Sequence, residues 1–257
     1  MSAKPYDVGV PIEGAVAVVS GANRGLGRAY VTALLERGAA RVYAGARNPE
    51  SIAAADDRVV AVALDITDTD AVSAAAALAA DATVVINNAG AMLESPFLSA
   101  TDAHAARTEM ETNYFGTLAM ARAFAPVLAA NGGGALVNVL SVASFYSLPF
   151  NASYCASKAA EWSLTNALRL EMHAAGTLVV GVHPGFIDTD MTATVSEAKI
   201  DPSEVAAQTL AAVEDGQPEV LTDDFTREVK QTIPSHLETL YPGVLKRWAA
   251  GDNPWGG

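Results

Sequence analysis

Three side chains near the middle of the sequence carry groups that suit proton transfer. Tyr154 and Lys158 are four residues apart, and Ser141 lies thirteen residues before Tyr154, at the end of an apolar run. Positions i and i+4 share a helix face, so the Lys158 ammonium can lie beside Tyr154. A phenol has a pKa of about 10, and a nearby cation lowers that pKa because it stabilises the phenolate. A serine hydroxyl beside them can bond the oxygen on which charge develops, so the set suits proton transfer to or from a carbonyl or alcohol oxygen.

This spacing by itself also fits an ordinary solvated pair on a helix, and two neighbours are rival candidates. Ser144 could take the role of Ser141, although it lies ten residues before Tyr154 instead of thirteen. Cys155 could be a nucleophile, but adjacent helix residues point in different directions and the sequence supplies no base for its thiol. We therefore interpret Cys155 as a small packing residue, and the rest of the sequence must decide on the chemistry.

Strand-like and helix-like segments alternate along the chain. The apolar runs are nearly continuous, which is typical of parallel strands buried on both faces, and the alternation with helices predicts a doubly wound α/β sheet. Expected strands are 15–20, 41–44, 59–64, 83–86, 135–140, 178–182 and 219–221; expected helices are 25–37, 68–80, 101–130, 153–175 and 202–214, with a less regular helix over 229–240 that is broken at Pro234. Ligands bind beyond the carboxyl ends of such strands, so motifs at strand ends carry the most weight.

Composition limits the partners and the compartment. The 257 residues fit one domain, with a core over about 14–221 and a C-terminal segment 222–257 that packs on it or serves an oligomer contact. A net charge of −13 argues against nucleic acid and anionic membranes as partners. Cys155 is the single cysteine, and no signal-peptide or membrane-span pattern is present, so we expect a cytoplasmic protein. The four histidines are scattered, and no metal site is expected.

A glycine-rich loop follows the first expected strand. The run Ser20–Gly27 has the spacing G-x-x-x-G-x-G and leads directly into a helix. Glycines allow a diphosphate to approach the backbone, and the helix N-terminus offers N–H donors with partial positive charge. An ordinary tight turn is the other interpretation, but the position at the first strand-to-helix turn favours a dinucleotide site.

Two arginines indicate which dinucleotide. An acidic residue usually follows the second strand in NAD-dependent proteins and bonds the ribose 2′-hydroxyl. Here Arg47 follows that strand, no acid occurs before Glu50, and Arg24 lies inside the glycine loop. Each arginine alone would pass for a surface residue. Together they favour the 2′-phosphate of NADP(H).

With these motifs in order, the chain resembles the short-chain dehydrogenase/reductase family from Gly14 to about Leu221. The resemblance implies a single-domain Rossmann-type fold with a seven-stranded parallel sheet in the order 3-2-1-4-5-6-7, in the NADP(H)-preferring branch. It also implies four catalytic residues, Asn113, Ser141, Tyr154 and Lys158. The cofactor-binding residues that it implies are Gly21, Asn23, Arg24, Gly25, Leu26, Gly27, Arg47, Asp65, Ile66, Asn88, Ala89, Gly90, Tyr154, Lys158, Pro184, Gly185, Ile187 and Thr189.

The implied reaction is hydride transfer between NADP(H) and a carbonyl carbon. Tyr154 would exchange the proton, Ser141 would bond the substrate oxygen, Lys158 would hold the cofactor ribose and lower the pKa of Tyr154, and Asn113 would hold a water of a proton relay. The segments 91–93, 145–150 and 186–195 offer an apolar wall without a basic cluster, so we expect apolar ketones, aldehydes or secondary alcohols as substrates. The side chains expected in this wall are Met92, Leu93, Phe145, Tyr146, Leu148, Phe150, Phe186 and Met191. The resemblance further implies a homodimer or homotetramer built on helices 101–130 and 153–175.

Three alternatives stay open at this point. The chain could be an NADPH-binding regulator without turnover, although such relatives typically lose the tyrosine or the lysine. It could catalyse epimerisation or dehydration, although those relatives carry a longer C-terminal part. It could also oxidise alcohols in the cell, because the chemistry is reversible.

Overall fold

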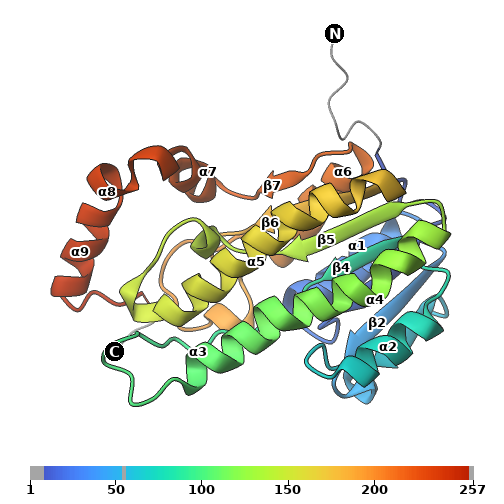
Figure 1. Ribbon diagram of the computed structural model, residues 1–257, viewed down its shortest axis with the longest axis horizontal. Coiled ribbons are helices and arrows are strands. Elements are labelled where there is room, and N and C mark those ends of the chain that lie inside the picture. The colour runs from blue at the N-terminus through green and yellow to red at the C-terminus, as the bar shows by residue number, and fades with distance from the viewer. Residues whose placement is uncertain (1–8, 54–55, 255–257) are drawn as a thin grey trace, which may run out of the picture.

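The architecture is a seven-stranded parallel sheet with helices on both faces, seen here in a computed structural model that describes residues 9–53 and 56–254. The sheet order is β3-β2-β1-β4-β5-β6-β7, which confirms the predicted fold class and order. Figure 1 shows the sheet between its helices. The strands are β1 Val16–Ser20, β2 Arg41–Ala46, β3 Val59–Ala63, β4 Val84–Asn87, β5 Gly134–Val139, β6 Thr177–His183 and β7 Glu219–Leu221.

Each face of the sheet buries one apolar stripe from its helices. Helices α1 (Gly25–Glu36) and α6 (Pro202–Glu214) pack together on one face, where Tyr30, Leu34 and Leu210 are fully buried. The opposite face is covered by α2 (Thr69–Leu78), α4 (Thr117–Ala130) and α5 (Ala152–Glu171). Burial on both faces explains why the strand sequences are continuous apolar runs, and it directs the polar strand ends toward one edge.

The long helix expected over 101–130 differs from the prediction. The chain becomes helical at α3 (His104–Glu109), where the Asp102 carboxylate accepts a hydrogen bond from the His104 amide at 2.8 Å. A π-helical segment, Met110–Gly116, then joins α3 to α4. Wider π turns occur frequently at functional sites because they displace one side chain relative to the regular helix. Here that segment carries Asn113.

The C-terminal tail confirms the predicted break at Pro234, but its helices extend beyond the predicted range 229–240. It forms α7 (Asp224–Gln231), α8 (His236–Thr239) and α9 (Tyr241–Ala249), with a 3-10 turn at Ile233–Ser235. Helix α7 begins earlier than predicted because the Asp223 side chain caps it, accepting from the Thr226 amide at 2.8 Å. These helices lie beyond the sheet end toward which β5 points (Figure 1).

The other predicted elements differ from the structure by at most a few residues at their ends, and 202–214 and 219–221 match fully. Strand β2 continues to Ala46 because its backbone pairs with β3 up to Ala63. Among residues 9–53 and 56–254, no helix has the length and apolar character needed to cross a membrane.

Candidate active site

A large cavity opens at the carboxyl ends of the strands. Its volume is about 1540 Å³, more than the roughly 300–1,000 Å³ of a typical small-molecule site, so it has room for a dinucleotide and a second small molecule. Of the residues predicted to act in catalysis or cofactor binding, all but Asn113 line it. The lining set is Gly21, Asn23, Arg24, Gly25, Leu26, Gly27, Arg47, Asp65, Ile66, Asn88, Ala89, Gly90, Ser141, Tyr154, Lys158, Pro184, Gly185, Ile187 and Thr189.

The glycine loop is built so that only glycine fits its key positions. Gly21 and Gly25 have φ angles of 64° and 48°, in the left-handed region that disfavours side chains. A Cβ on Gly27 would lie 2.0 Å from the carbonyl oxygen of Gly21. No side chain caps the start of α1 at Arg24, so the first amides of that helix lack a side-chain acceptor. These free donors beside the cavity fit a diphosphate group.

The hydroxyl of Ser20 ties the glycine loop to the neighbouring Asn88–Gly90 segment. Ser20 Oγ accepts hydrogen bonds from the backbone amides of Asn88 and Ala89, both at 3.0 Å, and it is 1% exposed. The Asn88 side chain in turn donates to the carbonyl oxygens of Ser20 (3.0 Å) and Gly21 (3.3 Å). One serine and one asparagine therefore hold two cavity walls in register.

The two arginines lie on the cavity wall in different surroundings. Arg24 forms an exposed ion pair with Asp190 at 3.4 Å, across the glycine loop. Arg47 lies near Asp65, whose pKa is lowered first by the hydrogen bond from the Thr67 amide and also by the charge of Arg47. An exposed pair such as Arg24–Asp190 contributes little stability, so its guanidinium can exchange partners at small cost.

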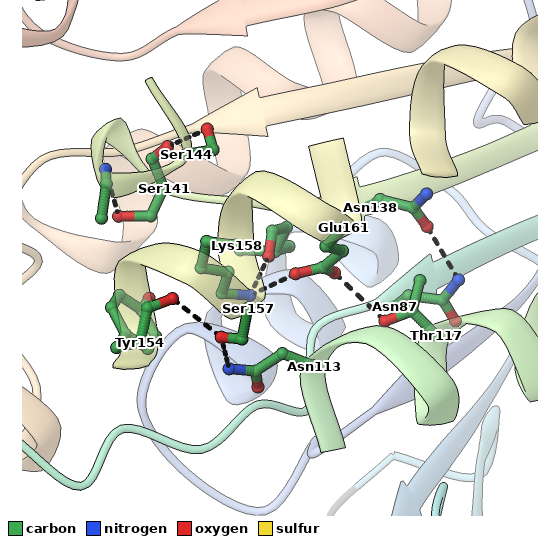
Figure 2. Close-up of polar contacts among 12 residues, drawn as sticks. Asn87, Asn113, Thr117, Asn138, Ser141, Ser144, Tyr154, Ser157, Lys158 and Glu161 are labelled. Carbon is green, nitrogen blue, oxygen red and sulfur yellow. Dashed lines mark hydrogen bonds and ion pairs between the residues drawn. The ribbon is translucent and has the colours of Figure 1, made fainter. Parts of the chain in front are cut away.

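Tyr154, Ser141 and Lys158 all line the cavity, and Figure 2 shows the three residues in one region at the end of β5 and the start of α5. Ser141 follows β5, its hydroxyl accepts from the Ala143 amide at 3.1 Å, and the Lys158 Nζ lies 5.9 Å from the centre of the Tyr154 ring. Burial raises the pKa of Tyr154, while the charge of Lys158 and the Ser141 hydrogen bond oppose that rise. Lys158 thus acts in the predicted direction, but desolvation outweighs it and the pKa stays above its ordinary value.

Lys158 has a partner that the sequence interpretation missed. Its ammonium donates to the Glu161 carboxylate at 2.7 Å and to the Val139 carbonyl at 2.9 Å. Glu161 also accepts from the Thr117 hydroxyl at 3.1 Å (Figure 2). The available signal was an acidic residue three positions after Lys158, on the same face of an otherwise half-apolar helix.

Asn113 lies behind the cavity wall and is fully buried. Its side chain accepts from the Ala91 amide and donates to the Ala91 carbonyl, both at 2.8 Å, and donates to the Ser157 hydroxyl at 2.8 Å. These bonds join the π-helical segment to helix α5 and to the loop after β4. The side chain of Asn113 therefore braces the wall behind Tyr154 and Lys158, and its predicted water-holding role stays a prediction.

The rival residues occupy structural positions. Ser144 points away from the cavity, donating to the Ser141 carbonyl at 2.5 Å and bonding His183 Nδ1 at 2.9 Å. Cys155 is 1% exposed, and burial raises the pKa of its thiol to about 11, so the thiol stays protonated near neutral pH. Within the described part of the chain, no group of three or more histidine, cysteine or acidic side chains could hold a metal.

The expected apolar wall forms in part. Six of the eight side chains that we expected from its segments line the cavity: Met92, Leu93, Tyr146, Leu148, Phe186 and Met191. Two of them do not. Phe145 is buried against the His183 ring at 4.2 Å between ring centroids, and Phe150 packs on Trp248 at 4.9 Å. Both rings pack on other aromatic side chains, so less of their apolar surface is exposed to water than if they lined the cavity.

The Pro184–Gly185 segment is held by a residue from the loop after β7. Asp223 accepts from the Gly185 amide at 2.8 Å, and a Cβ on Gly185 would lie 2.9 Å from the same carboxylate oxygen. Burial tends to raise the pKa of Asp223, but its hydrogen bonds from Thr226, Gly185 and Thr222 bring the pKa below the ordinary value. A charged carboxylate thus fixes this wall of the cavity.

Comparison with known proteins places this site in a family. A family model described as short chain dehydrogenase matches residues 15–200, and the chain belongs to that family, which confirms the resemblance. The chain is 33% identical to an uncharacterized oxidoreductase of Staphylococcus aureus strain N315, over 77% of this chain and 90% of the relative.

Comparison with solved structures finds the same fold in other short chain dehydrogenases. A short chain dehydrogenase from Burkholderia cenocepacia J2315, solved in complex with NADP, is 46% identical with a TM-score of 0.87, covering 91% of this chain and 98% of that one. A short chain dehydrogenase/reductase from Burkholderia phymatum in complex with NAD is 24% identical with a TM-score of 0.78, covering 95% and 97%, and it supports the fold alone.

Proposed function

We propose that this protein is an NADP(H)-dependent oxidoreductase that reduces apolar ketones or aldehydes to alcohols. The observation that carries the proposal is that Tyr154, Ser141 and Lys158 line the same cavity as the glycine loop. Membership of the short chain dehydrogenase family supports an enzyme of this class.

The cofactor choice rests on Arg24 and Arg47 beside the glycine loop, with no acidic residue between the end of β2 and Glu50. Guanidinium groups suit a 2′-phosphate because they carry permanent charge and donate in a planar fork. The NADP complex of the Burkholderia cenocepacia relative, at 46% identity, supports the same choice. When bound, the reduced cofactor supplies the hydride.

The side chains of the protein then supply one proton to the carbonyl oxygen and stabilise the negative charge that develops on it. Tyr154 donates a proton to the carbonyl oxygen, and Ser141 hydrogen-bonds that oxygen as its charge grows. Lys158 offers its remaining N–H to the cofactor ribose, because Glu161 and Val139 take the other two. Asn113 holds the relay water through which Tyr154 regains its proton, and its side-chain bonds keep that helix segment in place.

The substrate class follows from the wall opposite Tyr154. Met92, Leu148, Phe186 and Met191 present apolar surface to the cavity. Arg24 and Arg47 lie beside the glycine loop, Lys158 is paired with Glu161, and Arg107 of α3 is the one further cation among the lining residues, so a phosphorylated or carboxylated substrate would find no basic cluster there. An apolar carbonyl compound fits this lining better.

We further propose that the chain works as one domain, with core 14–221 and the segment 222–257 packing on it, in a cytoplasmic homodimer or homotetramer. Val229 of α7 and Val244 of α9 belong to the same apolar cluster as Tyr146 and Cys155, which both line the cavity, and this supports a tail that packs behind the cavity wall. Half-buried apolar side chains on α4 and α5, such as Leu118 and Leu164, support helix-to-helix association.

The test is NADPH consumption, followed by nicotinamide absorbance, across aliphatic, aromatic and steroidal ketones, with chiral analysis of the product. The Tyr154→Phe variant should lose nearly all turnover and keep NADPH affinity, whereas Tyr114→Phe, outside the cavity, should retain both. Substantial turnover by Tyr154→Phe would overturn the assignment of the proton donor. Tight NADPH binding without turnover on any carbonyl would favour a regulator, and faster oxidation at cellular cofactor ratios would reverse the direction.

A further inference from the structure

A buried ion pair lies immediately behind the catalytic tyrosine. Lys158 is 4% exposed and Glu161 is 1% exposed, and their charged atoms are 2.7 Å apart on the same face of α5 (Figure 2). Removing two charges from water costs several kcal/mol each, and packed apolar residues at such sites are often equally stable. The pair therefore calls for a reason other than stability.

Both partners are held in fixed directions. One oxygen of Glu161 receives the Lys158 ammonium and the other receives the hydroxyl of Thr117, which is itself 1% exposed and lies at the start of α4. The ammonium has three donors, of which one goes to Glu161 and one to the Val139 carbonyl. Lys158 also lines the cavity, so its third N–H is the one available on the cavity side.

We propose that Glu161 is a positioning residue of the active site, a fixed counter-ion that keeps the Lys158 ammonium protonated and aimed at the cavity, so that Tyr154 and Lys158 hold their two protons together to higher pH. This inference rests on the proposed function, in which reduction requires protonated Tyr154 and charged Lys158.

The net charge of the three groups decides how easily the first proton leaves. With Glu161 present, the fully protonated Tyr154–Lys158 pair and its carboxylate sum to zero. With an amide in its place, the same group carries one positive charge, so the first proton leaves more easily, whether it comes from Tyr154 or from Lys158. Either loss removes the form that is active in reduction.

Other charged groups near the pair do not replace Glu161. From α5, Cys155 is a protonated thiol near neutral pH. From β6, His183 is neutral, because burial lowers its pKa to about 3. From α3, Glu109 directs one carboxylate oxygen to the Leu93 amide at 2.6 Å. Burial tends to lower the pKa of Lys158, and the charge of Glu161 is the largest influence that raises it.

The experiment compares the full-length wild type with Glu161→Gln, and with Glu171→Gln as a matched control, an exposed position at the end of the same helix. Phenolate absorbance, with Tyr154→Phe subtracted, follows Tyr154. The ¹³Cε chemical shift follows Lys158, which is one of only five lysines and is assigned by its absence in Lys158→Arg. The same three proteins are assayed for the pH dependence of kcat/KM in NADPH-dependent reduction.

In Glu161→Gln the lower of the two pKa values, and the alkaline limb of kcat/KM, should fall by about one pH unit or more, while Glu171→Gln leaves both unchanged. An unchanged first proton loss in Glu161→Gln would overturn the proposal. If that variant does not fold, the wild type decides alone: the pKa of the Lys158 ammonium must lie above the ordinary lysine value, and a pKa below that value refutes the proposal. If the titration moves but the wild type reduces no carbonyl, the counter-ion role stands and the proposed function falls.

Discussion

Replacing Ser20 by alanine tests how the glycine loop is connected to the rest of the site. The hydroxyl is the acceptor for the backbone amides of Asn88 and Ala89 at 3.0 Å each, and the Ser20 residue is 1% exposed, so water cannot easily take its place. Threonine carries the same hydroxyl group. Ser20→Thr is therefore the matched control.

The size of the effect follows from the two lost acceptors. An amide left without its partner costs about 1–3 kcal/mol when buried, and these two amides are partly buried, so about 1–1.5 kcal/mol applies to each. The free energy of unfolding of Ser20→Ala should fall by about 2–3 kcal/mol. For a chain of this length, about 2–4 °C of Tm accompanies each kcal/mol, which predicts a drop of about 4–12 °C.

The assay is urea and thermal unfolding of the three proteins, with NADPH affinity measured by fluorescence titration. Ser20→Ala should lose stability and bind NADPH more weakly, because Asn88 and Ala89 line the cofactor end of the cavity. Ser20→Thr should keep most of both. If Ser20→Ala unfolded within about 0.5 kcal/mol of the wild type, the hydroxyl would not be the link between the two segments.

Three further outcomes follow from the site. Arg47→Ala should raise the Kd for NADPH at least about ten-fold and leave that for NADH within about two-fold, because only the phosphate loses a charged partner; equal losses would contradict this. Gly27→Ala should abolish NADPH binding and lower the Tm, since its Cβ would lie 2.0 Å from a carbonyl oxygen. As the control, Gly243→Ala meets nothing within 4 Å and lies in helix α9, so it should leave NADPH binding unchanged and should not lower the Tm. Burial lowers the pKa of His183 to about 3, so the unfolded imidazole, with a pKa of about 6.5, binds a proton that the folded one does not. Stability should therefore fall as the pH drops from about 6.5 toward 3, and His183→Asn should flatten that slope in unfolding experiments; equal slopes would rule the histidine out.

Much of the fold could be predicted because its signals are local. Continuous apolar runs separated by helix patterns predicted every strand, and the glycine spacing at Ser20–Gly27 located the first turn. The errors have two causes. The Asp223 cap, which starts α7 before the predicted point, is a local signal that the sequence interpretation missed, because its carboxylate accepts from an amide three residues on. The π-helical segment around Asn113 interrupts a sequence that reads as one continuous helix, and its side chain is fixed by contacts with Ala91 and Ser157, which are distant in the sequence.

Some features of the site could likewise be predicted from the sequence, and others depend on the tertiary structure. The sequence by itself determined which residue types stand at the strand ends and that Tyr154 and Lys158 share a helix face, because helical spacing and strand order place them there. Only the tertiary structure decided the partners of the buried polar groups: Thr117 meets Glu161, and Ser20 meets the amides of Asn88 and Ala89. Such partners are 44 and 68 or 69 positions apart, so no local pattern specifies them. They are set by which elements the packed sheet brings face to face, and burial then requires each polar group to find an acceptor or donor there.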